Sequence, residues 1–415
     1  MPCVCFLAFP PLPQSTQSPQ KAVHSNTQLI KTDKIHEKNW IYNTTLRLTP
    51  SPAITAPKLA LHDDLFIADL HSDALLWRRD LLQRHQQGHV DQPRMQSGNV
   101  ALQVFSAVTH SPFGQNFHGN SGDSNRVIPL VMAQGWPIKT WSSALQRALY
   151  QADRLKQAAA DSNGTLRLIQ NRADLFSLHL DRIYQPNISG ALLAIEGAQA
   201  LDGDANNLDA LYNAGYRMIG LTHFFDNTFG GSAHGLEQYG LTEEGKMLLQ
   251  KMAEKKMLID LAHASPALID DVLRYSSAPL FVSHSGVKGT CNSPRNLSDE
   301  QLRNIAARGG IIGIAFFPGA ICGPSVQHIT DALLYAVKIA GVNAVGLGSD
   351  FDGAVSTPFD AAGLSALTQS LVRAGLSEAD IRKIMGENIL RVFSKVLPPN
   401  PHLNSSFEID SDFTF

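Results

Sequence analysis

Residues 66–73 read Phe-Ile-Ala-Asp-Leu-His-Ser-Asp, an apolar run of β-strand character that ends in a His-x-Asp pair. Side chains two residues apart on a strand point the same way, so we expect the imidazole of His71 and the carboxylate of Asp73 to converge just past the strand. This arrangement is typical of metal ligands, although a structural turn explains a single pair equally well. The pair becomes a candidate site if other strands end in the same way.

Seven more apolar runs follow along the chain, and helical patterns separate most of them. The eight predicted strands are Phe66–Leu70, Ala101–Val108, Ala191–Ile195, Met218–Thr222, Leu258–Ala262, Leu280–Ser283, Ile311–Phe317 and Ala344–Gly348. Helices are predicted at Leu208–Asn213, Glu243–Lys256, Pro266–Arg274, Asp299–Ala307, His328–Ala340 and Ser377–Phe393. Such alternation is typical of an α/β fold with a parallel sheet. Because eight is the number of strands that closes a barrel, we predict a (β/α)8 TIM barrel.

A doubly wound open sheet shows the same alternation and is the alternative. That fold normally carries a phosphate-binding G-x-G-x-x-G loop after a strand. The nearest match here, Gly346-Leu347-Gly348-Ser349-Asp350-Phe351, lacks the third glycine. The sequence therefore favours the barrel.

The predicted barrel domain spans residues 61–397. Residues 1–60 are rich in Pro, Ser, Thr, Gln and Asn, which predicts a disordered or surface-lying extension, and residues 398–415 form a similar tail. Residues 109–190 exceed what one βα connection needs, so we expect an excursion over the barrel mouth. Within it, Phe113–Asn125 is predicted as a loop, and Ser142–Ala160 and Asn171–Leu180 as helices.

The composition excludes several classes of protein. The chain has 415 residues, of which 44% are hydrophobic, so it can bury a large core. A net charge of −3 offers no basic face for nucleic acid. We find no apolar run of eighteen residues that would span a membrane. The N-terminus is a poor signal peptide, because it lacks a basic region and a clear cleavage site. The compartment stays open between the cytoplasm and the periplasm or exterior.

The four cysteines, Cys3, Cys5, Cys291 and Cys322, contain no Cys-x-x-Cys motif. Neither a zinc ribbon nor a disulfide framework is indicated. Cys291 and Cys322 can pair only if the fold brings them together, and we expect both to be small buried hydrophobic residues instead.

Ionisable residues follow most of the predicted strands: His71, Asp73, Glu196, His223, His263, His284 and Asp350. The carboxyl ends of all barrel strands open onto one face, so these side chains are expected to converge there. Singly, a histidine at a strand end is usually structural, and Glu196 could cap a helix. Jointly, so many buried ionisable groups would be costly without a metal ion.

The predicted ligands are histidines and carboxylates without a thiolate, which suits zinc or a similar divalent ion. They outnumber the ligands of one tetrahedral ion, so two metals bridged by a carboxylate are expected. Such pairs generate hydroxide near neutral pH and polarise a carbonyl group. The sequence therefore predicts a barrel of the metal-dependent hydrolase type.

Some residues near these strand ends keep two interpretations. Asp350 or Asp352 could face the metals, and the glycine after Asp352 suggests that its carboxylate braces a turn. Asp226 and Asn227 could line the pocket, but turn formation explains them as well. Taken alone, Arg295 could simply form an ordinary ion pair on the surface.

The ordered motifs also resemble those of the membrane (renal-type) dipeptidases, peptidase family M19. They include Asp69-Leu70-His71-Ser72-Asp73, Ala194-Ile195-Glu196-Gly197, Leu221-Thr222-His223, Ile259-Asp260-Leu261-Ala262-His263-Ala264-Ser265, Phe281-Val282-Ser283-His284-Ser285, Ser293-Pro294-Arg295-Asn296-Leu297-Ser298-Asp299, Val345-Gly346-Leu347-Gly348-Ser349-Asp350-Phe351-Asp352-Gly353 and Gly386-Glu387-Asn388. The resemblance extends from about Leu65 to Val396, and together these motifs are highly specific.

The resemblance implies a role for each proposed metal ligand. His71 and Asp73 would hold one zinc ion and His263 and His284 the other, while Glu196 would bridge the two. A hydroxide between the metals would attack the peptide bond.

The resemblance also implies three substrate contacts. His223 would bind substrate and stabilise the oxyanion, and Arg295 would grip the terminal carboxylate, for which its planar fork is suited. Asp350 would contact the bridging water and the substrate amine, and would move the proton to the leaving group. Among Asp350 and Asp352, the family pattern favours the first.

The expected function is therefore that of a zinc-dependent dipeptidase, with D- or dehydro-residues accepted at the C-terminal position and a homodimeric assembly. The alternative is an amidohydrolase acting on a non-peptide amide, lactone or phosphoester. Barrels of that kind often begin with His-x-His and use a carboxylated Lys, whereas this chain has His-x-Asp and offers Glu196. A non-catalytic binding protein is disfavoured because no expected ligand is missing. We do not extend the membrane attachment of family members to this chain, since we recognise no hydrophobic anchor signal in the tail.

Overall fold

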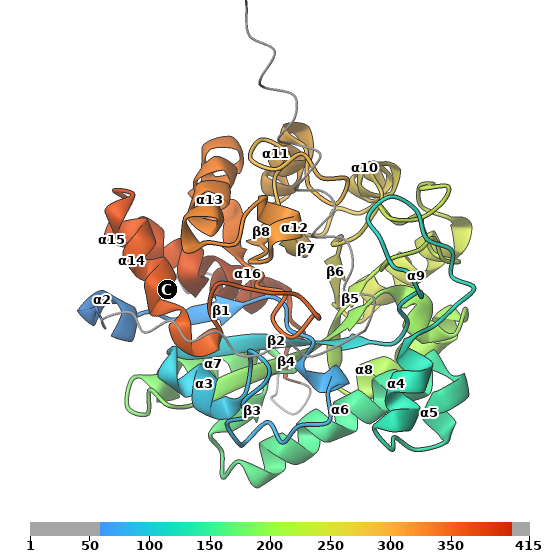
Figure 1. Ribbon diagram of the computed structural model, residues 1–415, viewed down its shortest axis with the longest axis horizontal. Coiled ribbons are helices and arrows are strands. Elements are labelled where there is room, and N and C mark those ends of the chain that lie inside the picture. Colours follow the sequence, from blue (N-terminus) through green and yellow to red (C-terminus); the bar gives the residue numbers. More distant parts are fainter. Residues whose placement is uncertain (1–58, 401–415) are drawn as a thin grey trace, which may run out of the picture. The chain divides into compact units, whose positions relative to one another are not determined.

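The computed structural model describes residues 59–400 (Figure 1). The expected N-terminal extension, residues 1–60, and C-terminal tail, residues 398–415, lie almost entirely outside the described residues. None of the helices in residues 59–400 has the length and apolar character needed to cross a membrane.

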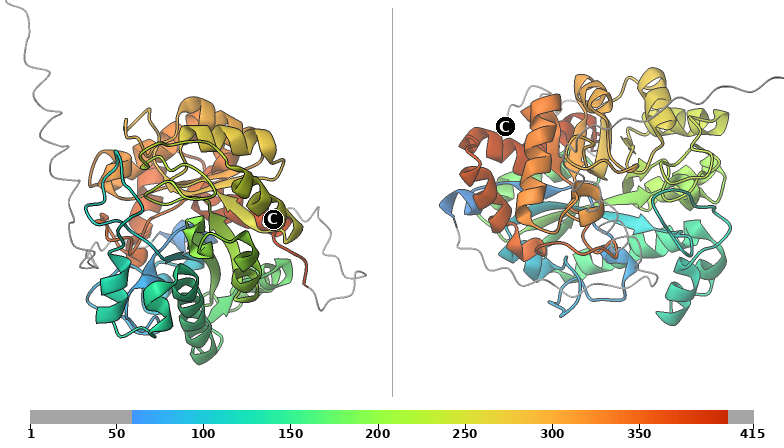
Figure 2. Two further views of the ribbon diagram at one scale, coloured as in Figure 1. Left: turned by 90° about the vertical axis from the view of Figure 1, so that its right-hand side faces the viewer. Right: turned by 45° about the horizontal axis from the view of Figure 1, so that its top comes forward.

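Eight parallel strands close into a barrel, as predicted, and helices surround them (Figure 1, Figure 2). The barrel strands are β1 Ile67–Asp69, β2 Val100–Val108, β4 Ser189–Glu196, β5 Tyr216–Gly220, β6 Leu258–Asp260, β7 Leu280–Ser285, β8 Ile311–Ile314 and β9 Val345–Leu347. They pair in the order β2-β1-β9-β8-β7-β6-β5-β4, and β4 pairs with β2 to complete the ring. All eight predicted strands are present, with ends that shift by a few residues.

A ninth strand, β3 (Leu166–Leu168), was not predicted from the sequence. It pairs with Ser189–Ala191 at the start of β4, whereas β5 pairs with the end of the same strand from Leu193. The short β3 therefore lies beside the barrel rather than in its ring. Three residues with Arg167 at their centre form no apolar run, so no pattern predicts this strand.

The helices are α2 Ala60–Asp63, α3 Gln92–Ser97, α4 Val127–Ala133, α5 Lys139–Ser142, α6 Ala144–Asp161, α7 Arg172–Arg182, α8 Leu208–Asn213, α9 Glu243–Glu254, α10 Pro266–Tyr275, α11 Asp299–Ala307, α12 Pro318–Ile321, α13 Val326–Ala340, α14 Ser365–Arg373, α15 Glu378–Arg382 and α16 Asn388–Val396. α8 and α11 begin and end at the predicted residues. For α11 the reason is local, because Ser298 and Gln301 form a capping box at its start. The short helices α2, α3, α4 and α12, and the longer α14, were not predicted.

The prediction of one continuous helix over Ser377–Phe393 is wrong. This segment divides into α15, a π-helical turn at Lys383–Glu387, and α16, with non-helical backbone at Gly386. A Cβ atom at Gly386 would lie 1.9 Å from the carbonyl oxygen of Phe66. The break therefore lets the chain pass directly against the start of β1.

The strands are buried along their length, as expected of a parallel sheet covered on both faces. Neighbouring residues on one strand join different apolar clusters. Val104, Leu192 and Phe281 pack in one cluster with Phe393 of α16. A second cluster contains Phe105, Leu193 and Val282 together with side chains from many of the surrounding helices. This packing holds the strand ends in place.

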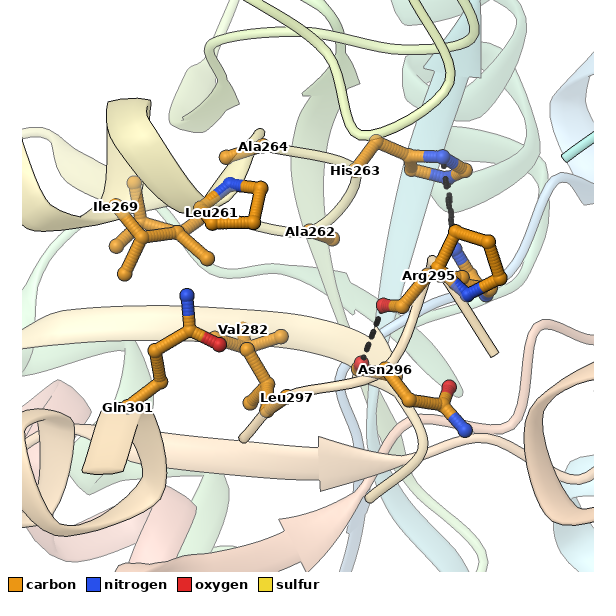
Figure 3. Close-up of a pocket in the computed structure, with 13 residues that line it drawn as sticks. Leu261, Ala262, His263, Ala264, Ile269, Val282, Arg295, Asn296, Leu297 and Gln301 are labelled. Carbon is orange, nitrogen blue, oxygen red and sulfur yellow. Dashed lines mark hydrogen bonds between the residues drawn. The ribbon is translucent and has the colours of Figure 1, made fainter. Parts of the chain in front are cut away.

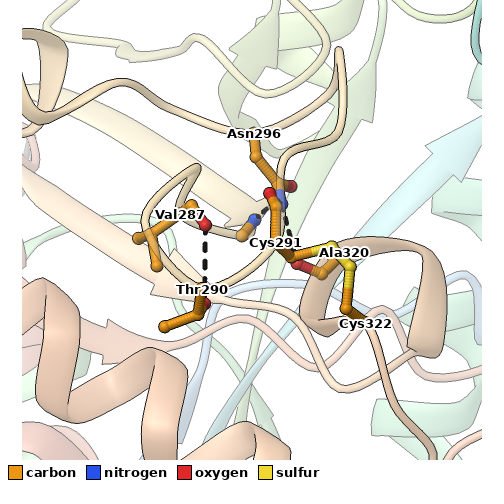
Figure 4. Close-up of a disulfide and its surroundings, with 7 residues drawn as sticks. Val287, Thr290, Cys291, Asn296, Ala320 and Cys322 are labelled. Carbon is orange, nitrogen blue, oxygen red and sulfur yellow. Dashed lines mark hydrogen bonds between the residues drawn. A yellow bond between two sulfur atoms is a disulfide. The ribbon is translucent and has the colours of Figure 1, made fainter. Parts of the chain in front are cut away.

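The expectation that Cys291 and Cys322 are unpaired buried residues is wrong, because they form a disulfide (Figure 4). Cys291 lies in the loop after β7 and Cys322 directly follows α12, which comes after β8. β7 and β8 are neighbours in the barrel, so these connections meet and the Cα atoms lie 5.3 Å apart. Cys291 is buried, whereas Cys322 is exposed. The pairing depends on barrel topology, which the 31-residue separation does not reveal.

Candidate metal centre

The structure brings the strand-end residues together at one mouth of the barrel. His71 and Asp73 follow β1, Glu196 ends β4, and His223 follows β5. His263 follows β6, His284 lies in β7, and Asp350 follows β9. All seven side chains are buried, with 1–7% of each residue exposed.

Glu196 lies at the centre of this cluster. Its Oε1 atom is 3.2 Å from His263 Nε2, 3.4 Å from His284 Nε2 and 3.6 Å from His71 Nε2. Its Oε2 atom is 3.4 Å from His223 Nε2. One carboxylate thus faces four imidazoles that come from four different strands.

Two pairs of ligand atoms are closer to each other than to the rest. His71 Nε2 lies 3.2 Å from Asp73 Oδ1, and His263 Nε2 lies 3.0 Å from His284 Nε2. Tetrahedral ligands at about 2.0–2.1 Å from a zinc ion would themselves be separated by distances of this size.

Three overlapping groups of side chains have ligand atoms within 4.8 Å of one another. They are His71 with Asp73 and Glu196, His71 with His284 and Asp350, and Glu196 with His223 and His263. His71 and Glu196 each belong to two groups. The cluster therefore has more potential ligands than one tetrahedral ion uses.

Burial perturbs the protonation of this cluster. It holds the pKa values of His263 and His284 well below the usual range of histidine, so both rings are neutral. Burial also raises the pKa of Glu196 well above its usual range, an effect that the nearby Asp73 charge strengthens. Burial alone would lower the pKa of His71, but Asp73 and Glu196 outweigh it and raise the value to about 10. The pKa of Asp350 is raised to about 7, chiefly by burial.

These properties fit a divalent cation. The neutral rings of His263 and His284 are in the form of histidine that binds metals, and a cation would stabilise carboxylates that burial otherwise disfavours. Glu196 Oε2 is buried and accepts no hydrogen bond, although His223 Nε2 is near it. A buried carboxylate oxygen without a donor is costly unless a cation compensates.

Two of the cluster residues have strained backbone. His263 and Asp350 adopt φ values of 63° and 61°, which non-glycine residues rarely do. Such strain concentrates at functional sites, where the surrounding structure maintains it. The turn after Asp350 also requires a glycine at position 353, because a Cβ atom there would lie 2.2 Å from Asp350 Oδ1.

Arg295 lies beside this cluster as a buried cation. It is 5% exposed, and no carboxylate in residues 59–400 lies within ion-pair distance of its guanidinium. Nη2 donates to the carbonyl of His284 at 3.2 Å, and the group lies over the ring of Phe317. Its Nε atom is buried without an acceptor. The surface ion pair considered for Arg295 from sequence is therefore wrong.

A small pocket lies next to Arg295. Figure 3 shows His263 and Arg295 at one end of it and Ile269 and Gln301 at the other. The walls between them are largely apolar. Arg295 therefore lies between this pocket and the metal cluster.

Asp352 takes the structural role that was considered for it. Its carboxylate accepts hydrogen bonds from the backbone N–H groups of His89 at 2.6 Å and Val90 at 3.2 Å, and it pairs with Arg79. It belongs to none of the three ligand groups. Asp350, by contrast, is in one of them.

Asp226 and Asn227 brace the loop after β5. The Asp226 carboxylate accepts from the N–H groups of Ser232 and Glu237, and the Asn227 side chain contacts the backbone of Leu221 and Phe229. Turn formation thus accounts for both residues.

His234, which the sequence analysis did not single out, packs beside the cluster. Its ring is fully buried 5.3 Å from that of His263, and it stacks on Phe224. Nδ1 bonds the carbonyl of Phe117, while Nε2 has no partner. His234 lies in the middle of a long loop rather than at a strand end, so no pattern around it in the sequence indicates a role at the site.

A closed (β/α)8 barrel with buried histidines and carboxylates at the carboxyl ends of its strands defines a metal-dependent hydrolase. The chain belongs to the membrane dipeptidase family, peptidase family M19, which matches residues 56–404. The family and the ligand cluster together identify a metal-dependent dipeptidase.

Solved structures agree with this assignment. A structure described as the dipeptidase AC, a metallopeptidase of family M19, is 25% identical, with a TM-score of 0.65 over 80% of this chain and 99% of that one. A metallopeptidase from Rhodobacter sphaeroides, liganded with a phosphinate mimic of L-Ala-D-Ala, is 27% identical, with a TM-score of 0.66 and the same coverage. Among curated proteins, an uncharacterized protein of the pqqA 5' region of Klebsiella pneumoniae is 34% identical over 259 residues, which are 58% of this chain and 93% of that protein.

Proposed function

We propose that this chain is a dizinc dipeptidase that hydrolyses the peptide bond of dipeptides, including those with a D-residue or dehydro-residue at the C-terminal position. The observation that carries the proposal is the buried, carboxylate-free guanidinium of Arg295 next to the cluster. A substrate carboxylate would provide a direct ion pair, which none of the carboxylates in residues 59–400 makes with this guanidinium. A free carboxylate one residue from the scissile bond is what distinguishes a dipeptide from a longer chain.

The division of the ligands follows the two close pairs. His71 and Asp73 would hold one zinc ion, His263 and His284 the other, and Glu196 would bridge them. The distances of Glu196 Oε1 to three of the imidazoles support this bridging position. When bound, the ions would lower the pKa of a water between them to yield the attacking hydroxide, and would polarise the peptide carbonyl.

Arg295 orients the substrate. Bidentate pairing with the terminal carboxylate would fix the peptide bond relative to the ligand cluster, and the apolar surroundings of the guanidinium strengthen that pairing. The relative liganded with the L-Ala-D-Ala mimic supports acceptance of a D-residue at this end.

Asp350 is the proposed proton carrier. Its Oδ1 atom lies 4.0 Å from His71 Nε2, and its pKa of about 7 lets the carboxyl both take up and release a proton near neutral pH. It would accept the proton of the attacking water and pass it to the leaving amine.

His223 is the proposed substrate ligand opposite Arg295. Its Nδ1–H donates to the carbonyl of His110 at 3.0 Å, and burial holds its pKa well below the usual range. The neutral ring therefore presents Nε2 as an acceptor. This tautomer suits a hydrogen bond from a substrate N–H, whereas stabilisation of an oxyanion would require the protonated ring.

The test is to measure metal per chain and to offer L,L- and L,D-dipeptides beside tripeptides, lactones and phosphotriesters. Two zinc equivalents with release of free amino acids from dipeptides alone are expected. Turnover only of non-peptide substrates would establish the amidohydrolase alternative, and metal-free, inactive protein would refute both. Homodimer formation, also proposed from the family resemblance, is tested by light scattering on the eluting protein.

A further inference from the structure

One hydroxyl group connects two of the histidines in the metal centre. Ser283 Oγ lies 2.9 Å from Nδ1 of His284, its neighbour on β7, and 3.3 Å from Nδ1 of His71, which follows β1. Ser283 is fully buried. The two histidines would belong to different zinc ions in the proposed function, so the same oxygen contacts one proposed ligand of each ion.

The hydrogen bonds around Ser283 allow one complete arrangement. A hydroxyl has one proton to donate and two lone pairs that accept. Asp260 Oδ1 accepts from the Ser283 N–H at 2.8 Å, which brings the carboxylate next to the Ser283 hydroxyl. A carboxylate only accepts, so the hydroxyl proton points to Asp260. Both lone pairs are then available to the two Nδ1–H groups.

This arrangement fixes which nitrogen of each ring is free. With Nδ1 protonated and bonded to Ser283, Nε2 is the nitrogen left for a metal in both rings, and it faces Glu196 Oε1 at 3.6 Å in His71 and 3.4 Å in His284. In the metal-free protein His71 also carries a proton on Nε2, which points to Asp73 Oδ1 at 3.2 Å and is the proton that a metal would displace. If the hydroxyl instead donated to one ring, that ring would carry its proton on Nε2, where a metal ligand needs a lone pair.

We propose that Ser283, oriented by Asp260, is a positioning residue shared by both metal sites, which sets the tautomer and direction of one histidine ligand at each. This inference rests on the proposed division of ligands between two ions. Groups that orient metal-bound histidines typically contribute 10–100-fold to metal affinity. Here a single hydroxyl contributes at two sites at once.

The first experiment measures zinc binding to metal-free protein by competition with a chelator. We expect Ser283→Ala to raise both zinc dissociation constants about 10–100-fold. The matched control is Ser370→Ala in α14, which removes a buried hydroxyl bonded to Thr330 Oγ1 at 2.7 Å. That variant should bind zinc as the wild type does. Weakening of one site only, or of neither, would overturn the proposal.

The second experiment is independent of metal and of activity. In protein labelled with ¹⁵N-histidine, NMR distinguishes Nδ1-protonated from Nε2-protonated rings. We expect His284 to be protonated at Nδ1 alone and His71 at both nitrogens, and we expect the Nδ1 resonances of both rings to change in Ser283→Ala and in Asp260→Asn. The Asn variant keeps an acceptor for the backbone N–H groups but presents an N–H₂ group to the hydroxyl. A wild-type His284 protonated at Nε2 instead of Nδ1, or a His71 without a proton on Nδ1, would refute the arrangement.

The two experiments separate this inference from the proposed function. If the wild type binds two zinc ions and cleaves dipeptides but Ser283→Ala binds zinc normally, only the positioning role fails. If the wild type binds no zinc, the proposed function fails, and the ring tautomers alone decide the inference. Unfolding curves of the metal-free variants show whether each has retained its fold.

Discussion

Among single residues, Glu196 makes the most direct test of a shared metal centre. Its Oε1 atom lies within 3.6 Å of three imidazole nitrogens from different strands. Glu196→Gln keeps the shape but removes the charge, so we expect zinc content to fall at both sites and dipeptide turnover to drop at least about 1,000-fold, about 4 kcal/mol of activation free energy. Metal analysis together with kcat checks this. Glu244→Gln, an exposed change in α9, is the control. Loss of only one zinc would contradict the bridge.

Arg295 carries a separate prediction about specificity. Arg295→Ala should retain zinc and mainly raise KM, with kcat/KM for dipeptides lowered about 10–150-fold, which corresponds to about 1.5–3 kcal/mol for a charged hydrogen bond. The sharper measurement compares a dipeptide with its C-terminal amide. The wild type should strongly prefer the free carboxylate, and the variant should not. Unchanged dipeptide kinetics would show that the guanidinium does not bind the substrate.

The site residues differ in how well the sequence predicts them. His71, Glu196, His263 and His284 follow from a physical rule, because the carboxyl ends of parallel barrel strands share one face. His234 obeys no such rule. It reaches the cluster through a long loop that Asp226 braces, and loop geometry of this kind is set by tertiary hydrogen bonds rather than by a local pattern.

The same contrast applies to elements. The eight barrel strands were predictable because burial on both faces requires apolar runs, as along the whole of β2. β3 has too few residues to form such a run. The kink between α15 and α16 depends on how closely Gly386 approaches Phe66, a contact between distant parts of the chain that periodicity does not encode.

The loop between β7 and α11 shows how an element can support the site. It carries Arg295, and the disulfide joins it to Cys322 beyond α12 (Figure 4). Asn296 adds to this link, because its Nδ2 donates to the carbonyls of Cys291 and Ala320, each at 2.8 Å. The loop is thus held on both sides of the arginine.

Removing the disulfide should therefore affect both stability and substrate binding. We expect Cys291→Ser with Cys322→Ser to lower the free energy of unfolding by about 2–4 kcal/mol and to raise KM more than it changes kcat. Urea unfolding and dipeptide kinetics measure the two effects. A loss of stability with unchanged KM would mean that Asn296 alone suffices to position Arg295.

At the scale of the whole molecule, the barrel gathers ionisable groups whose preferences conflict without a metal ion. In metal-free protein, burial raises the pKa of Glu196 well above its usual range and that of Asp350 to about 7, so both tend to hold protons. A raised folded pKa gives a carboxyl stability that is present at low pH and lost as the pH rises through that value. The metal-free protein should therefore lose this part of its stability as the pH approaches and passes 7.

Bound cations reverse this pH dependence of stability. The ligands must be deprotonated to bind a cation, so binding releases protons and becomes more favourable as the pH rises. The rise in Tm that zinc produces should consequently grow from pH 5.5 to pH 8. His71 acts in the same direction, because its ring has a pKa of about 10 in the metal-free protein and must lose a proton to bind zinc. His263 and His284, whose pKa values burial lowers, are already neutral across this range and release no proton. Calorimetry of metal-free and zinc-loaded protein across this range measures the difference. A zinc-dependent rise in Tm that shrank with increasing pH would show that these buried groups do not bind the metal.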